Sequence, residues 1–307
     1  MIRRRSARPG FTLIELLVAL VLVVALGAVM MAMWVGQLRA FTRSKESSAM
    51  QRDLRMGLSL LPMDLRAASV SLGDLRSMTD TAIRLRATIG SSIACARPDA
   101  YTIDIPPQGL DKNVLTSWYT EPKVGDWVTI YVSSDLDPSK DSWRLLQIKS
   151  LDLAPLSACM GPPFTDPVLD PPDKKSRWRI GLNDSVSVVE AGIGKPIRFL
   201  RQVRYALTKS AVTNRWYLGY SDSLAAGWSP TEPVAGPFSP YAATGGGIAF
   251  TYFDTTGAPV VNPPAGTRIG RVDVVLRTSA RVRQGKGTVI TRDSVALRIA
   301  LRNRQVQ

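Results

Sequence analysis

The chain has 307 residues, 45% of them hydrophobic and 21% charged, a composition typical of a folded protein of one or two domains and not of a disordered one. It contains no histidine and two cysteines, which excludes the usual four-ligand zinc site and any chemistry that depends on an imidazole base. The formal net charge of +14 favours anionic partners such as nucleic acid, anionic lipid or an acidic protein, although compositional drift toward arginine is the simpler explanation.

A short basic leader and a long apolar segment open the chain. Four arginines lie within the first ten residues: Arg3, Arg4, Arg5 and Arg8. Residues 16–36 contain no charge, and 21 helical residues span about 32 Å, enough for the hydrocarbon core of a bilayer. Glu15 lies at the start of this segment, where an isolated carboxylate costs about 2.5–3.5 kcal/mol at mid-bilayer on insertion scales. The pattern predicts a transmembrane helix over 11–36 in which Glu15 has a functional role.

Three explanations of this N-terminus compete. A secretory signal peptide would be cut near 25–27, but the apolar run continues well past that point. A plain signal anchor would use Thr12 and Glu15 only as a capping box, which their spacing allows. The third explanation rests on six consecutive residues, Gly10-Phe11-Thr12-Leu13-Ile14-Glu15, placed between a basic leader and about twenty apolar residues. This pattern resembles the class III signal of type IV pilins and type II secretion pseudopilins.

The resemblance implies a set of roles for the N-terminal residues. In that family a membrane aspartyl peptidase cuts after the glycine, so residues 1–10 would be a leader and Gly10 and Phe11 the scissile pair. Phe11 would then carry a methylated amine, and Glu15 would pair with the N-terminal amine of a neighbouring subunit. Because that peptidase acts on the cytoplasmic side, the chain would cross the inner membrane once, with the rest in the periplasm. The positive-inside rule alone leaves the orientation open, since arginines and lysines follow the apolar segment too.

Residues 37–70 are predicted to extend the same helix with an amphipathic character. Its apolar residues form one stripe, Leu54, Leu58, Leu61, Leu65 and Ala68, with Asp53 and Asp64 off it. Pro62 removes one backbone hydrogen bond and is a candidate kink.

Beyond Gly73 the hydrophobic pattern changes to period two, which predicts strands. The predicted strands are 82–87, 101–105, 127–133, 143–151, 178–182, 186–190, 197–208, 215–220, 247–253, 269–278 and 288–301. No strand–helix–strand alternation occurs, so the expected class is α+β, with one long N-terminal helix packed on an antiparallel, pilin-like head over 71–307. The proline-rich stretches 154–173 and 227–247 are expected to be loops.

Cys95 and Cys159 both follow the apolar segment. A disulfide between them is allowed outside the cytoplasm, and two free buried thiols are the alternative. Residues 135–141 carry alternate oxygen ligands like a calcium loop but lack its glycine and distal glutamate, so a solvated turn is the better interpretation. The sequence predicts no metal and no cofactor.

The last forty residues are strongly basic, with ten lysines and arginines against Asp273 and Asp293. Arg277, Arg281 and Arg283 are expected to line one edge of a sheet, where charge also discourages aggregation. The sharper hypothesis is a basic face for an acidic partner subunit or for DNA.

No enzyme motif is complete in this chain. Gly194-Lys195 lacks the first glycine of a phosphate-binding loop, and Ser221 lacks the second glycine of a nucleophile elbow. Segments 203–207, 215–220, 247–254 and 272–276 loosely resemble J-type pseudopilins and W-type minor pilins. The absence of proline between Pro9 and Pro62 also fits a minor subunit. The expected function is a minor pilin or pseudopilin at the tip or initiation complex of a pilus or secretion filament. The alternative is a single-pass envelope protein whose β-rich head binds a ligand without forming a filament.

Overall fold

The computed structural model describes residues 12–109, 114–133, 138–166, 168–170, 176–224, 227–242, 246–284 and 287–301, without the side chains of 138, 224 and 281–288. These residues form two compact units, which are taken separately below. One unit comprises residues 1–51 with 279–292, and the other comprises 52–278 with 293–307.

One helix, α1 (Leu13–Ala67), accounts for nearly all of the helical structure among the described residues. It runs through Pro62 without interruption, so the proline does not end it. In the larger unit Leu54, Leu61 and Leu65 are buried and belong to a hydrophobic core, as the apolar stripe predicts, while Leu58 is half-buried. Asp53 and Asp64, which lie off that stripe, are buried as well.

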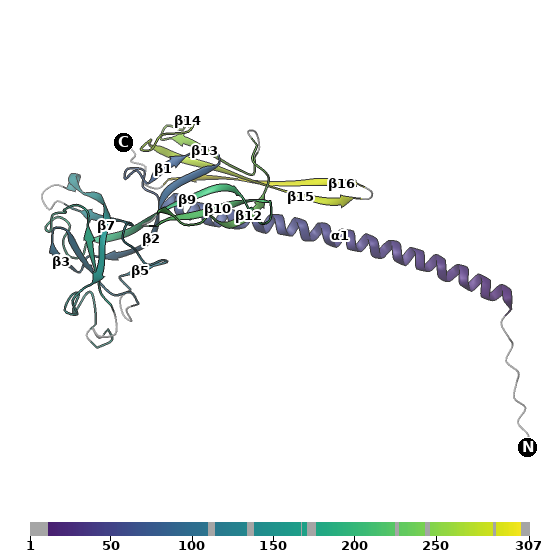
Figure 1. The fold of residues 1–307 in the computed structure, drawn as a ribbon, viewed down its shortest axis with the longest axis horizontal. Coiled ribbons are helices and arrows are strands. Elements are labelled where there is room, and N and C mark those ends of the chain that lie inside the picture. The colour runs from purple at the N-terminus through teal and green to yellow at the C-terminus, as the bar shows by residue number, and fades with distance from the viewer. Residues whose placement is uncertain are drawn as a thin grey trace, which may run out of the picture. The chain divides into compact units, whose positions relative to one another are not determined.

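Antiparallel strands make up the rest of the fold (Figure 1). One sheet has the order β1-β2-β9-β6-β7-β8-β4-β3, with β5, β10, β11 and β12 attached to it, and a second has the order β14-β13-β15-β16. The strands are β1 (Leu75–Met78), β2 (Ala82–Ile93), β3 (Ala96–Asp99), β4 (Thr102–Ile105), β5 (Ser117–Trp118), β6 (Trp127–Val132), β7 (Ser142–Leu153), β8 (Trp178–Leu182), β9 (Pro196–Lys209), β10 (Trp216–Leu224), β11 (Gly227–Trp228), β12 (Glu232–Phe238), β13 (Ile248–Asp254), β14 (Pro259–Val260), β15 (Ile269–Gln284) and β16 (Gly287–Ala300), with a short 3-10 helix at Pro138–Lys140. The expected α+β class is therefore confirmed in this coarse form.

The paired strands β2 and β9 connect the two hydrophobic cores of the larger unit. They pair from Ala82 opposite Ala206 to Ile93 opposite Pro196, with one register shift between Thr88 and Gly90. At one end Ile83, Leu85 and Val203 join a core that includes α1 and the strands β13 and β15. At the other end Ile197 and Phe199 join a second core with β4, β6, β7 and β8. A single pair of long strands thus carries side chains into both cores.

Two predictions about individual segments were wrong. Residues 186–190 are not a strand but a turn region, because the Arg97 guanidinium donates to the carbonyls of Val186 and Ala191 at 3.1 and 2.7 Å and holds this loop away from any ladder. The stretch 227–247 was expected to be a loop, yet it contains β11 and β12. Strand β12 accommodates its prolines because it pairs only with β10 and so lies at an edge.

A buried polar contact joins α1 to the sheet within the larger unit. The Tyr205 hydroxyl donates to Asp64 Oδ2 at 2.7 Å, and both residues are buried. Burial raises the pKa of the Asp64 carboxyl, and the hydrogen bond from Tyr205 opposes that shift only in part. Because a buried acceptor is costly without its donor, this pair fixes the position of the helix against β9.

We predict that Asp64→Asn becomes increasingly stabilising relative to the wild type as the pH rises. The raised native pKa means that the ionised carboxyl is disfavoured in the folded state, so the wild type loses stability from about pH 4, the unfolded value, up through the native pKa. The asparagine keeps an acceptor for Tyr205 and has no such loss. Unfolding of the full-length protein in detergent, followed from acidic to neutral pH, measures the difference.

The matched variant Tyr205→Phe removes the donor instead and should cost about 1–3 kcal/mol at neutral pH. A wild type that gains stability over Asp64→Asn with rising pH would contradict the proposed cost of the ionised carboxyl.

Candidate functional site

The start of α1 is a reciprocal capping box. Thr12 donates from its backbone nitrogen and from Oγ1 to Glu15 Oε2, each at 3.0 Å, and the Glu15 nitrogen donates to Thr12 Oγ1 at 3.4 Å. The spacing of a threonine and a glutamate three residues later is the one that satisfies two free amides at a helix start. The carboxylate also lies at the positive end of the helix dipole, which stabilises a negative charge. Glu15 therefore has local partners within a single chain.

The residues that follow Glu15 expose an apolar surface in their own unit. Leu16, Val23 and Trp34, for example, are 62%, 68% and 64% exposed. The most apolar window of α1 has a mean hydropathy of 2.9 and none of it is buried, so by length and composition α1 is a candidate membrane span. An exposed apolar surface of this length is typical of helices that lie in lipid or pack against other helices.

The remaining predicted site residues are only partly described. Gly10 and Phe11 lie outside the described residues, as do residues 135–137 of the calcium-like stretch. Arg277 is half-buried and donates from Nη1 to the carbonyl of Gly246 at 3.0 Å, while the side chains of Arg281 and Arg283 are not among those described. A basic face built from these three arginines therefore stays a prediction.

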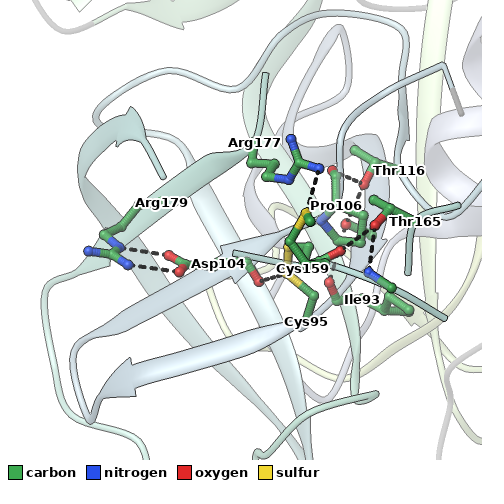
Figure 2. The surroundings of a disulfide bond; sticks show 12 residues. Ile93, Cys95, Asp104, Pro106, Thr116, Cys159, Thr165, Arg177 and Arg179 are labelled. Atoms are coloured by element: carbon green, nitrogen blue, oxygen red, sulfur yellow. Dashed lines mark hydrogen bonds and ion pairs between the residues drawn. A yellow bond between two sulfur atoms is a disulfide. The ribbon is translucent and has the colours of Figure 1, made fainter. Parts of the chain in front are cut away.

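A disulfide joins Cys95, at the start of the β3 hairpin, to Cys159 in the proline-rich loop (Figure 2). Their Cα atoms are 5.1 Å apart, within the normal range for a disulfide. Cys95 donates its backbone N–H to the Asp104 carbonyl at 2.9 Å, and Thr165 Oγ1 donates to the Cys159 carbonyl at 2.7 Å. The bond ties a loop without regular structure to the edge of the sheet.

Buried ion pairs account for several of the charged residues in the head. Arg201 forms a bidentate pair with Asp126, at 2.9 Å from Nε and 2.7 Å from Nη2, and both side chains are buried. These hydrogen bonds raise the pKa of the Arg201 guanidinium above its already high value. Arg179 makes a similar fork with Asp104 beside the disulfide (Figure 2). Such pairs position strands and present no free base or nucleophile.

Sequence patterns gave no sign of these ion pairs. Asp126 and Arg201 are 75 positions apart in the chain, and so are Asp104 and Arg179, so no local spacing connects them. Within the described part of the chain no group of three or more cysteines and carboxylates is placed to hold a metal ion.

Comparisons of this chain with models of protein families, with curated proteins and with solved structures found no match. An interpretation of its function must therefore come from the N-terminal pattern and from the geometry of the described residues.

We predict that replacing both cysteines by serine destabilises the folded head by about 4 kcal/mol. The disulfide closes a loop of 64 residues, and the chain-entropy model assigns roughly this loss to opening it. Denaturant unfolding of wild type and Cys95→Ser/Cys159→Ser, each with and without a reductant, measures it. Reductant should lower the stability of the wild type alone, and equal stability of wild type and double variant without reductant would contradict the prediction.

Proposed function

We propose that the protein is a minor pilin or pseudopilin, a structural subunit and not an enzyme. It is anchored in the inner membrane by α1 as a precursor, with its β-rich head in the periplasm. Prepilin peptidase cuts it between Gly10 and Phe11, and the methylated Phe11 then begins the mature helix. Other pilins or pseudopilins are its partners in the tip or initiation complex of a type IV pilus-like or type II secretion filament.

The observation that carries this proposal is the carboxylate of Glu15 at the start of an exposed apolar helix. Glu15 lies four residues after Phe11, the residue that follows Gly10. An apolar helix leaves the bilayer at low cost only if other apolar helices replace the lipid around it. Cleavage after Gly10 creates a cationic amine four residues before Glu15. A buried carboxylate is tolerated when an amine of this kind pairs with it.

The head is consistent with a filament subunit in which the C-terminal part of the helix also forms part of the core of the head. The four segments that resemble J-type pseudopilins and W-type minor pilins fall in β9, β10, β13 and β15. All four strands contribute to the core that contains Leu54, Leu61 and Leu65 of α1. The resemblance therefore lies in the strands that pack with the helix and not in the peripheral loops.

A second candidate function is a single-pass envelope protein whose head binds a ligand. The capping box favours it, since Thr12 and Glu15 are satisfied within one chain and need no neighbour. The capping box does not explain Gly10, Phe11 or the arginine-rich leader. Co-purification from membranes separates the two functions. A filament subunit should co-purify with pilin-like proteins, and a ligand-binding envelope protein should not.

We predict that the mature protein begins at N-methylated Phe11. Mass spectrometry of the protein from cells with and without prepilin peptidase should show this terminus only when the peptidase is present. An intact Met1, or a terminus near Gly27 as a signal peptide would leave, would overturn the proposed processing.

We predict that Glu15→Leu and Glu15→Gln are both inserted and cleaved but incorporated at least tenfold less into filament fractions. Glutamine preserves the capping box because it can also accept from Thr12, but it has no charge to pair with an amine. Immunoblots of sheared filaments and of membranes measure the ratio. Normal incorporation of Glu15→Gln together with failure of Glu15→Leu would reduce Glu15 to a capping residue.

A further inference from the structure

Arg84 and Arg204 face each other on neighbouring strands of the larger unit, and Arg76 lies at a bulge of the next strand; these three residues are called the arginine row. Arg84 on β2 lies directly opposite Arg204 on β9, and on its other side β1 places Ser77 opposite Arg84. Arg76 precedes Ser77 at a register shift in β1 and is exposed. Residues opposite each other in an antiparallel pair have their side chains on the same face, where two like charges are unfavourable. The strands thus hold two guanidinium groups together at a cost.

The described part of the chain supplies no carboxylate for this row. Among the described residues, no ion pair involves Arg76, Arg84 or Arg204. The Nε atom of Arg84 is buried and has no hydrogen-bond partner. The Nε atom of Arg86, two residues further along the same face, is likewise buried without a partner, but its Nη1 is paired with Asp74 at 3.2 Å.

Asp74 lies near the row but is engaged by Arg86, and the acidic residues of β10 and β12 lie on the opposite face of the sheet. Asp222 is opposite Val203, and Glu232 is opposite Tyr220, which in turn is opposite Tyr205. Val203 and Tyr205 point into the core with α1, on the face away from Arg84 and Arg204. Asp222 is moreover engaged by Arg201 at 3.4 Å. The positive charge of the arginine row is therefore not cancelled on its own face.

An aromatic side chain borders the row. The guanidinium carbon of Arg84 lies 5.8 Å from the centre of the Trp228 ring, and Trp228 is 40% exposed. Tryptophan and arginine are both enriched among the residues that dominate protein–protein binding energy. The ring also limits the freedom of the Arg84 guanidinium and so lowers the entropic cost of a bidentate contact.

We propose that Arg76, Arg84, Arg204 and Trp228 form a docking surface for an acidic segment of a partner protein. Two adjacent guanidinium groups match the planar carboxylates of aspartate and glutamate. A second copy of the chain is a poor occupant, because its net charge is +14 and it would be repelled. Extended nucleic acid is less well matched, since phosphate contacts need a longer basic track than this row provides. The surface does not depend on cleavage at Gly10 or on filament formation.

Fluorescence anisotropy of the full-length protein in nonionic detergent tests the surface. The probe is a fluorescein-labelled peptide of alternating glutamate and glycine, compared with a glutamine peptide of equal length and a labelled single-stranded DNA. Arg84→Glu and Arg204→Glu should each weaken binding of the glutamate peptide about tenfold or more. Arg215→Glu, an equal charge change at an exposed arginine outside the row, should weaken it much less. Trp228→Ala should weaken it without changing net charge.

Thermal unfolding separates binding from folding. Arg204→Glu places an opposite charge across from Arg84, so its melting temperature should equal or exceed that of the wild type while its binding is lost. Because Arg204 is exposed, this variant decides the question even if Arg84→Glu does not fold. Failure of the wild type to bind the glutamate peptide, equal losses with Arg215→Glu, or binding of DNA alone would each overturn the proposal.

Discussion

One helix has to satisfy two different surroundings, and the rest of the fold follows from this constraint. In α1 the residues after Glu15 are apolar on every side, as lipid or a helix bundle requires. From Leu54 onward only one stripe is apolar, as packing on a sheet requires. The strands that receive this stripe are long and antiparallel, and β2 and β9 extend beyond it into a second core. The contact between Asp64 and Tyr205 fixes the stripe at one point, where hydrophobic packing alone would allow it to slide.

The sequence predicted the features that depend on local periodicity. The helix, its apolar stripe and the longer strands were predicted because hydrophobic spacing repeats over many residues, although β2 and β15 run past their predicted ends and the short strands β1, β3, β5 and β14 were not predicted. The failures have specific causes. Residues 186–190 alternate like a strand, but Arg97 binds their loop from a distant position in the chain. Strand β12 contains prolines that argue against a strand in general, though not against an edge strand.

The candidate sites, too, divide into those set by neighbouring residues in the sequence and those set by contacts between distant residues. The N-terminal pattern is contiguous, so the sequence alone suggests cleavage at Gly10, and the capping geometry of Thr12 and Glu15 follows from their spacing. The arginine row could not be predicted, because Arg84 and Arg204 are adjacent only through the register of β2 with β9. Arg277 was selected from a dense basic stretch near the end of the chain, but it donates to the Gly246 carbonyl and so has a structural role as well.

The high arginine content of the chain thus has two physical meanings. Arg86, Arg179 and Arg201 are paired with carboxylates, and Arg179 and Arg201 do so through planar forks, which lysine cannot form. Compositional drift toward arginine is a sufficient explanation where each added guanidinium acquires a partner. It is not sufficient for Arg84 and Arg204, because drift gives no reason to keep two guanidinium groups opposite each other beside an exposed tryptophan. An arrangement that costs folding energy and supplies unused hydrogen-bond donors is best explained by an acceptor that arrives from outside the chain.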